Sequence, residues 1–337
     1  MPDKPASVEE QAQRFARAFE RIKQEIAKAI VGQDAVVTET LITIVAGGHA
    51  LLEGVPGLGK TYLVRTISEA LDLKFSRIQF TPDLMPADIT GTDLIREDAG
   101  GSKRFEFQPG PIFANIVLAD EINRATPKTQ SAMLEAMQEH NVTTGGVVRP
   151  VPEPFFVLAT QNPLEMEGTY PLPEAQLDRF FFKVLVPFPM LAELSDIVTR
   201  TTGRETAKIA KVLGSKELLA MRMFARETPV AEPVLRYAMR VILATHPQNG
   251  EAPERVRRLV SYGSSPRGGQ ALIQAARIRA LLDGRYNVGF EDIVRSAKPA
   301  LRHRIILNFE GEAERISPDS IIGDILEKVG MGEELPV

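Results

Sequence analysis

One short stretch constrains the fold of this chain more than any other feature of its sequence. It reads GVPGLGKT over residues 54–61 and fits the phosphate-binding pattern G-x-x-x-x-G-K-[ST]. An apolar run at 50–52 precedes it, and apolar residues recur at helical spacing after it, at Leu63, Val64, Ile67, Ala70 and Leu71. The stretch therefore predicts a strand, a phosphate-binding loop and a helix. A glycine-rich turn without a ligand is the alternative, and the strand–loop–helix frame disfavours it.

The residue types in this loop suit a nucleoside triphosphate. Glycines reach backbone conformations that are closed to residues with a Cβ, so successive N–H groups can point at phosphate oxygens. Lys60 would place its positive charge on the β- and γ-phosphates, and the Thr61 hydroxyl would be a ligand of Mg²⁺. The helix that follows directs the positive end of its dipole at the same anion.

A second chemical site is expected at Asp120 and Glu121, which end a continuous apolar run at 116–119. Such a run suits a strand buried on both faces, and an acidic residue at its carboxyl end is how Mg²⁺ is held in this class. We assign Asp120 to the metal through water, and Glu121 to orienting and polarising the attacking water. The alternative for Asp120 is a cap on the following helix. Asn162 ends a later strand and could bond the water or the γ-phosphate, although on spacing alone a turn-forming asparagine is favoured.

Composition narrows the protein class. The chain has 337 residues, of which 44% are hydrophobic and 25% charged, as in ordinary globular proteins. The formal net charge of −4 argues against a protein built mainly to bind nucleic acid. Cysteine is absent, which fits a reducing compartment. With no signal peptide at the N-terminus and no apolar stretch near the roughly 20 residues that span a bilayer, we expect a cytoplasmic protein.

The rest of the chain divides into a part with strands and a helical part. Strands are expected at 50–52, 74–80, 116–119, 155–160 and 181–186. Hairpins are expected at 92–107, turning at 99–102, and at 141–148, turning at 145–146. A capped helix with one apolar stripe opens the chain after a loose leader at 1–6, and a tail closes it at 330–337. After the breaker at 187–189, helices are expected at 218–226, 232–245, 268–282, 290–296 and 321–329.

The run DEINRA at 120–125, taken with residues 54–61, resembles the AAA+ ATPases, specifically the MoxR family. Four further stretches are similar to segments of that family. They are TQNP at 160–163 (sensor 1), YPLPEAQLDRF at 170–180 (the arginine-finger segment), SPR at 265–267 (sensor 2) and IVGQ at 30–33 (the adenine-facing segment). The resemblance runs from about residue 19 to about residue 308, and no motif position departs from the family pattern.

This resemblance implies a fold and an assembly. The fold is an α/β P-loop NTPase with an αβα sandwich around a parallel central sheet, followed by a C-terminal all-α lid domain. We expect the ATPase core, with its N-terminal helix and two hairpin insertions, at 1–189 and the lid at 190–337. One hairpin would interrupt the helix after the strand at 74–80. The assembly is a self-associated ring, usually a hexamer, with ATP and Mg²⁺ bound between subunits.

The resemblance also implies residue roles. Arg179 would act in trans on the γ-phosphate bound by a neighbour, whereas without the resemblance it would be an ordinary surface ion-pair partner. Arg267 would reach from the lid to the phosphates and report the nucleotide state. The expected catalytic residues are Lys60, Glu121, Asn162, Arg179 and Arg267. The expected nucleotide contacts are Val31, Gly32, Gly54, Pro56, Gly57, Leu58, Gly59, Lys60, Thr61 and Tyr62, and the expected metal ligands are Thr61 and Asp120.

Three functions compete. The resemblance favours an ATPase that remodels a protein client for metallocofactor insertion or complex assembly, with a partner that carries a von Willebrand factor A domain. A nucleic-acid motor is disfavoured, because residues 143–147 carry no Lys or Arg and the basic residues of the other hairpin are offset by acidic ones. Those residues are Arg96, Lys103 and Arg104 against Asp93, Glu97 and Asp98. A magnesium-chelatase-like subunit stays open, and the sequence gives no sign of the acceptor pocket that a small-molecule kinase needs.

Overall fold

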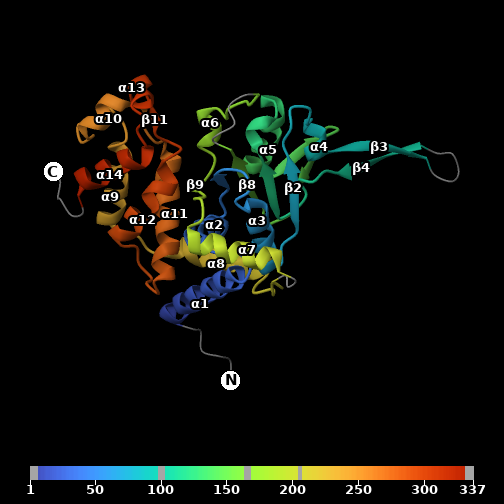
Figure 1. The fold of residues 1–337 in the computed structure, drawn as a ribbon, viewed down its shortest axis with the longest axis horizontal. Helices are drawn as coiled ribbons and strands as arrows, with labels where there is room; N and C mark the ends of the chain where they lie inside the picture. The colour runs from blue at the N-terminus through green and yellow to red at the C-terminus, as the bar shows by residue number, and fades with distance from the viewer. Residues whose placement is uncertain (1–6, 98–102, 163–167, 204–206, 331–337) are drawn as a thin grey trace.

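A computed structural model of the chain describes residues 7–97, 103–162, 168–203 and 207–330. Five parallel strands form its central sheet in the order β2-β5-β8-β1-β9 (Figure 1). Their bounds are β1 (Ala50–Glu53), β2 (Phe75–Gln79), β5 (Ile116–Asp120), β8 (Phe156–Gln161) and β9 (Phe182–Leu185). The expected parallel α/β sheet is confirmed. The expected leader at 1–6, the turn at 99–102 and the tail from residue 331 lie outside the described residues.

Helices cover both faces of this sheet, because alternate strand residues point to opposite sides. On β1, Ala50 and Leu52 join the core formed with α1, α2 and α3, while Leu51 joins a second core formed with α5. The bounds are α1 (Val8–Ala27), α2 (Asp34–Ala46), α3 (Lys60–Ala70) and α5 (Pro127–Glu139). The chain thus forms the expected αβα layers.

The first helix begins as its sequence predicts. The Ser7 hydroxyl accepts a hydrogen bond from the Glu10 amide, and the Glu10 carboxylate accepts one from the Ser7 amide. This capping box satisfies two of the amides that a helix start leaves unpaired. The apolar stripe of α1 is buried along its length, at Ala12, Phe15, Phe19, Ile22 and Ile26.

Both hairpins form, and they contact each other. They are β3 (Gly91–Glu97) with β4 (Lys103–Pro109), and β6 (Asn141–Thr144) with β7 (Val147–Pro150). The β3–β4 hairpin projects from one end of the molecule (Figure 1). It does not interrupt a helix as expected: the five-residue α4 (Pro86–Thr90) precedes it, and residues 110–115 lead into β5 through turns and bends.

The C-terminal region is helical apart from one small strand pair. Its helices are α7 (Leu191–Thr202), α8 (Ser215–Glu227), α9 (Glu232–Leu243), α10 (Glu254–Leu259), α11 (Pro266–Leu282), α12 (Phe290–Leu301), α13 (Phe309–Ala313) and α14 (Pro318–Val329). The antiparallel pair of β10 (Val260–Tyr262) and β11 (Ile306–Leu307) was not expected from the sequence. Helices α9 to α14 gather at the end opposite the β3–β4 hairpin, whereas α7 and α8 lie beside α1 (Figure 1).

The chain also contains α6 (Glu174–Leu177) and a 3₁₀ turn, η1 (Ile122–Arg124). Among the helices of the described residues, none combines the length and the apolar character that a membrane crossing needs.

Candidate functional site

The phosphate-binding loop joins β1 to α3, as its sequence predicts. Gly57 and Gly59 have φ values of 84° and 73°, the left-handed region that favours glycine. Gly54 is required for a different reason, because a Cβ there would lie 2.8 Å from the Val186 carbonyl oxygen. Gly59 precedes α3 without a side-chain cap on the helix amides. Unpaired amides at a helix start, behind glycines that hold the loop open, fit a phosphate group.

Lys60 and Thr61 are the first two residues of α3. The Lys60 ammonium donates to the Gly54 carbonyl oxygen at 2.5 Å, so it lies over the loop. Partial burial lowers the pKa of Lys60, and the carboxylates of Asp120, Glu121 and Glu53 oppose that shift. The lysine of the loop therefore lies within the field of the acidic pair, the arrangement needed for a site that holds phosphates and Mg²⁺ together.

The acidic pair lies at the carboxyl end of β5. Asp120 is buried, and its Oδ1 accepts a hydrogen bond from the Thr160 hydroxyl at 2.6 Å. Glu121 follows in a left-handed conformation with φ of 56°, which is unusual for a residue with a side chain. The Glu121 amide donates to the Thr160 hydroxyl at 2.8 Å. One hydroxyl on β8 thus positions both acidic residues.

Two further side chains, both on β2, hold these carboxylates. Arg77 pairs with Asp120, with its Nη2 2.7 Å from Oδ2. The Gln79 amide nitrogen donates to a carboxylate oxygen of Glu121 at 2.9 Å, and Arg124 Nε lies 3.2 Å from the same oxygen. Arg77 and Gln79 were not expected at the site, and Thr160 was expected only as part of the 160–163 segment, without a role of its own. Their signal is the sheet register, which places Gln79 opposite Asp120.

Asn162 follows β8, the strand between β5 and β1. It is buried. The carboxyl ends of these three neighbouring strands therefore bring together the loop, the acidic pair and Asn162. A crevice outside the carboxyl ends of parallel strands is where ligands bind in open α/β sheets. The remainder of the 160–163 segment, Pro163, lies outside the described residues.

The segment at 30–33 lies against the loop. The Gln33 side-chain amide donates to the Leu58 carbonyl oxygen at 3.1 Å. Gly32 has φ of 72°, and a Cβ there would lie 2.3 Å from the Glu193 carboxyl carbon on α7. Val31 is half-buried beside it, and Tyr62 on α3 is 42% exposed. The contact of this segment with α7 was not expected from the sequence.

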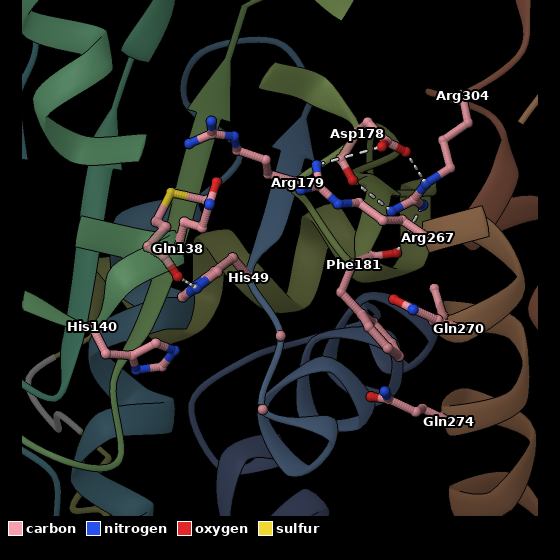
Figure 2. Close-up of a pocket in the computed structure, with 14 residues that line it drawn as sticks. His49, Gln138, His140, Asp178, Arg179, Phe181, Arg267, Gln270, Gln274 and Arg304 are labelled. Atoms are coloured by element: carbon pink, nitrogen blue, oxygen red, sulfur yellow. Dashed lines mark hydrogen bonds and ion pairs between the residues drawn. The ribbon is translucent and has the colours of Figure 1, made fainter. Parts of the chain in front are cut away.

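Arg179 and Arg267 lie at the opposite edge of the sheet. Both line a hollow of about 240 Å³ together with residues that immediately precede β1, including Gly48 and His49 (Figure 2). Because β1 has four residues, this hollow and the loop are separated by about 13 Å of strand. Arg179 donates to the Leu134 carbonyl oxygen at 2.9 Å, and its Nε is buried without a hydrogen-bond partner. The structure thus brings the two arginines together and separates them from the loop of the same chain.

Comparisons with known proteins agree with this architecture. Residues 49–182 match the family described as "ATPase family associated with various cellular activities (AAA)", and residues 252–325 match the "AAA lid domain". The chain is 43% identical to the chaperone MoxR1 of Mycobacterium tuberculosis, over 93% of this chain and 82% of that protein. It is 33% identical to the protein MoxR of Methylorubrum extorquens, over 90% and 92% of the two chains. A crystal structure of a protein from Cytophaga hutchinsonii that is proposed to be an ATPase superposes with a TM-score of 0.89 and 40% identity, covering 96% and 98% of the two chains.

Proposed function

The chain belongs to the MoxR family of AAA+ ATPases, and from that premise we propose that it hydrolyses ATP to ADP and phosphate between the subunits of a ring. One observation carries the proposal: the groups that suit ATP hydrolysis lie at two opposite edges of one sheet. The loop, the acidic pair and Asn162 lie at the carboxyl edge, and Arg179 and Arg267 lie at the amino edge. A neighbour that presents its amino edge to this carboxyl edge completes the site.

The carboxyl edge supplies the half that binds and attacks. The loop amides and Lys60 would hold the phosphates, and Thr61 and, through water, Asp120 would hold Mg²⁺. A bound Mg²⁺ offsets the negative charge of the phosphate oxygens. Glu121 accepts hydrogen bonds from the attacking water and orients it toward the γ-phosphorus, and Asn162 fixes the same water or a γ-oxygen. Gln79 and Arg124 must release part of their hold on Glu121 for this contact to form.

The amino edge supplies the half that stabilises charge. Arg179 and Arg267 of one subunit approach the γ-phosphate held by the next and neutralise the charge that develops in the transition state. The Nε of Arg179 is buried and unpartnered, so a rearrangement that exposes it to the neighbour would break no hydrogen bond at that nitrogen. Head-to-tail contacts of this kind close into a ring, and a hexamer is the ring we propose.

We assign the energy of hydrolysis to the remodelling of a protein client. The support is the similarity to a relative named as a chaperone and the movement of one subunit against the next that a shared site allows. Metallocofactor insertion or complex assembly is the proposed task, with a partner that carries a von Willebrand factor A domain. A nucleic-acid substrate has less support, because the cation on β7, Arg149, packs over the Phe107 ring and lies 3.6 Å from Asp93.

Mixed rings test the shared site. The Glu121→Gln variant should bind ATP and hydrolyse it about 100-fold to 10,000-fold more slowly, because it loses the group that activates water. The Arg179→Ala variant should also be slow, because it lacks the guanidinium that would stabilise the transition state in the neighbouring subunit. Mixing the two should restore roughly a quarter of the wild-type rate, because one interface in four combines an intact loop with an intact Arg179. The rate of phosphate release is the measurement.

Two controls accompany this test. Lys60→Ala should lose ATP binding and so should not recover with Glu121→Gln, since both variants have a defective loop side. Absence of recovery for Arg179→Ala with Glu121→Gln, while native mass spectrometry detects mixed rings, would contradict the shared site. The wild-type rate should also be measured with DNA or RNA, and with any protein that the Glu121→Gln variant captures in the presence of ATP. Strong stimulation by the nucleic acid and none by the captured protein would instead favour a nucleic-acid motor.

A further inference from the structure

Arg304, three residues after α12, is a buried cation of the helical region that contacts the segment carrying Arg179. Its side chain is 2% exposed, and its Nε lies 2.9 Å from Asp178 Oδ1. Its other nitrogens donate to main-chain carbonyl oxygens of Asp178 at 3.0 Å, Phe180 at 2.6 Å and Phe181 at 3.3 Å, and to that of Ala300. Burial lowers its pKa to about 10, with Asp178 opposing the shift, so the guanidinium stays charged at neutral pH.

Asp178, the residue before Arg179, joins this contact to the start of α11. Both of its carboxylate oxygens lie within hydrogen-bond distance of the Ser265 hydroxyl, at 2.8 and 2.9 Å. That hydroxyl in turn accepts a hydrogen bond from the Arg267 amide at 3.2 Å. Arg267 Nη1 lies 3.6 Å from Asp178 Oδ2 (Figure 2). One carboxylate therefore connects Arg304, Arg267 and the main chain of Arg179.

His303, the residue before Arg304, holds the same strand entry, whereas Arg302 contacts β9 further along the strand. The His303 ring nitrogen Nε2 lies 3.0 Å from the Phe180 carbonyl oxygen, and Arg302 Nη1 donates to the Lys183 carbonyl oxygen at 2.8 Å. Burying charge costs free energy, and an apolar pair could fill the same space. The guanidinium differs from an apolar side chain because its planar group of N–H donors makes directional hydrogen bonds. These bonds fix several carbonyl groups of one short segment at once. That segment contains Arg179, whose side chain we propose enters the site of the neighbouring subunit.

We propose that Arg304 is a positioning residue for the shared ATPase site: through Asp178 it locks Arg179 to the first turn of α11, so that Arg179 and Arg267 are presented to the neighbouring subunit as one rigid pair. The inference rests on the proposed function. Movement of the α11–α12 unit then moves Arg179 with it, which couples that unit to hydrolysis at the next subunit. Because misplacement by about 1 Å can cost on the order of 100-fold in rate, loss of the lock affects catalysis rather than ATP binding.

The first measurement separates catalysis from binding. Arg304→Gln should lower kcat by about 10-fold to 100-fold, while the affinity for ATP and the ring assembly change by less than about two-fold. Asp178→Asn, which keeps the shape of the side chain but removes its charge, should act in the same direction and serves if Arg304→Gln fails to fold. The matched control is Arg302→Gln. Arg302 is a partly buried arginine that pairs with Asp319 but does not contact Asp178, so its variant should retain kcat.

Mixed rings decide between positioning and a general structural role. Arg304→Gln should recover activity when mixed with Glu121→Gln, which supplies an intact Arg179, and should not recover with Arg179→Ala. Recovery with Arg179→Ala, absence of recovery with Glu121→Gln, or an equal loss in Arg302→Gln would overturn the inference while the shared site stands. If Arg179→Ala and Glu121→Gln themselves fail to recover in proven mixed rings, the proposed function falls first and the inference falls with it.

Discussion

Thr160 shows how one hydroxyl holds two acidic residues of the proposed site. It donates to Asp120 and accepts from the Glu121 amide, so it holds Glu121 in a left-handed conformation that few residues with a side chain adopt. A threonine at the start of a TQNP run carries no sign of this role. Its importance follows from β8 lying beside β5, which places the hydroxyl within reach of both groups.

We predict that Thr160→Val lowers the ATPase rate more than the affinity for ATP. The change keeps the shape of the side chain but leaves the Glu121 amide and one Asp120 oxygen without their partner, at a cost of about 1–3 kcal/mol in stability. The rate should fall by about 10-fold or more, and isothermal titration should find ATP affinity nearly unchanged. Thr160→Ser retains the hydroxyl and is the control. Equal rates for the valine and serine variants would show that the hydroxyl does not position Glu121.

His49 should make the fold sensitive to acid. Its Nε2 lies 3.0 Å from the Met137 carbonyl oxygen and its Nδ1 accepts from the Val157 amide at 3.0 Å, so the ring is held neutral. Burial lowers the pKa of His49 from 6.5 to about 4. The unfolded chain therefore takes up a proton between pH 6.5 and pH 4 that the folded chain does not, and the free energy of unfolding decreases as pH falls through that window.

The predicted size of this effect is about 3 kcal/mol across the window, since one pKa unit corresponds to about 1.4 kcal/mol. Urea unfolding at pH 6.5 and pH 4.5 should show a smaller loss for His49→Gln than for the wild type. The buried His303, whose pKa is also lowered by burial, contributes equally to both proteins and cancels in the difference. Identical pH dependence in both proteins would exclude His49 as the acid-sensitive group.

At the scale of elements, the two hairpins are linked to each other. Arg149 on β7 lies 3.7 Å from the centre of the Phe107 ring on β4, and 3.6 Å from Asp93 on β3. Two insertions separated by more than 30 residues of chain therefore meet through one cation. The two hairpins therefore form one connected surface.

We predict that Arg149→Ala loosens both hairpins without affecting the ATP site. A cation over an aromatic face contributes about 0.5–2 kcal/mol, so backbone amides of β3, β4, β6 and β7 should exchange hydrogen several-fold faster while those of β5 do not. Arg96→Ala is the control, because its exposed pair with Glu106 lies within one hairpin and contributes little. Faster exchange in only one hairpin would contradict the link.

The sequence predicts the helices and strands better than it predicts which of them lie next to each other in space. Apolar runs and glycine turns identify the strands of the sheet and both hairpins, because these patterns are local. Strand order is not local, so the contacts of Arg77 and Gln79 with the acidic pair on β5 could not be read from spacing. The β10–β11 pair was missed for a related reason, since its strands are two and three residues long and lie more than 40 residues apart.

At the scale of the molecule, the central sheet separates two groups of polar residues. The loop and the acidic pair lie at the carboxyl edge, and Arg179 and Arg267 lie at the amino edge. The loop and the acidic pair of the carboxyl edge were predicted from motifs and spacing. Arg179 and Arg267 were expected only from the resemblance, which implied that Arg267 reaches the phosphates from the lid. The structure places Arg267 beside Asp178 and Arg179, across the sheet from the loop of its own chain. An experiment can therefore decide whether Arg267 contacts the phosphates bound by its own chain or those bound by the neighbouring subunit.

We predict that Arg267→Ala behaves as a defect of the donating edge. Mixed with Glu121→Gln, it should recover roughly a quarter of the wild-type ATPase rate, because the partner supplies an intact Arg267 to its neighbour. Mixed with Arg179→Ala, it should not recover, since both variants then lack groups on the same edge. If Arg267 instead served the loop of its own chain, the pattern would reverse, with recovery beside Arg179→Ala and none beside Glu121→Gln. The same two mixtures thus assign the arginine to one edge or the other, and the assignment requires only phosphate release as its readout.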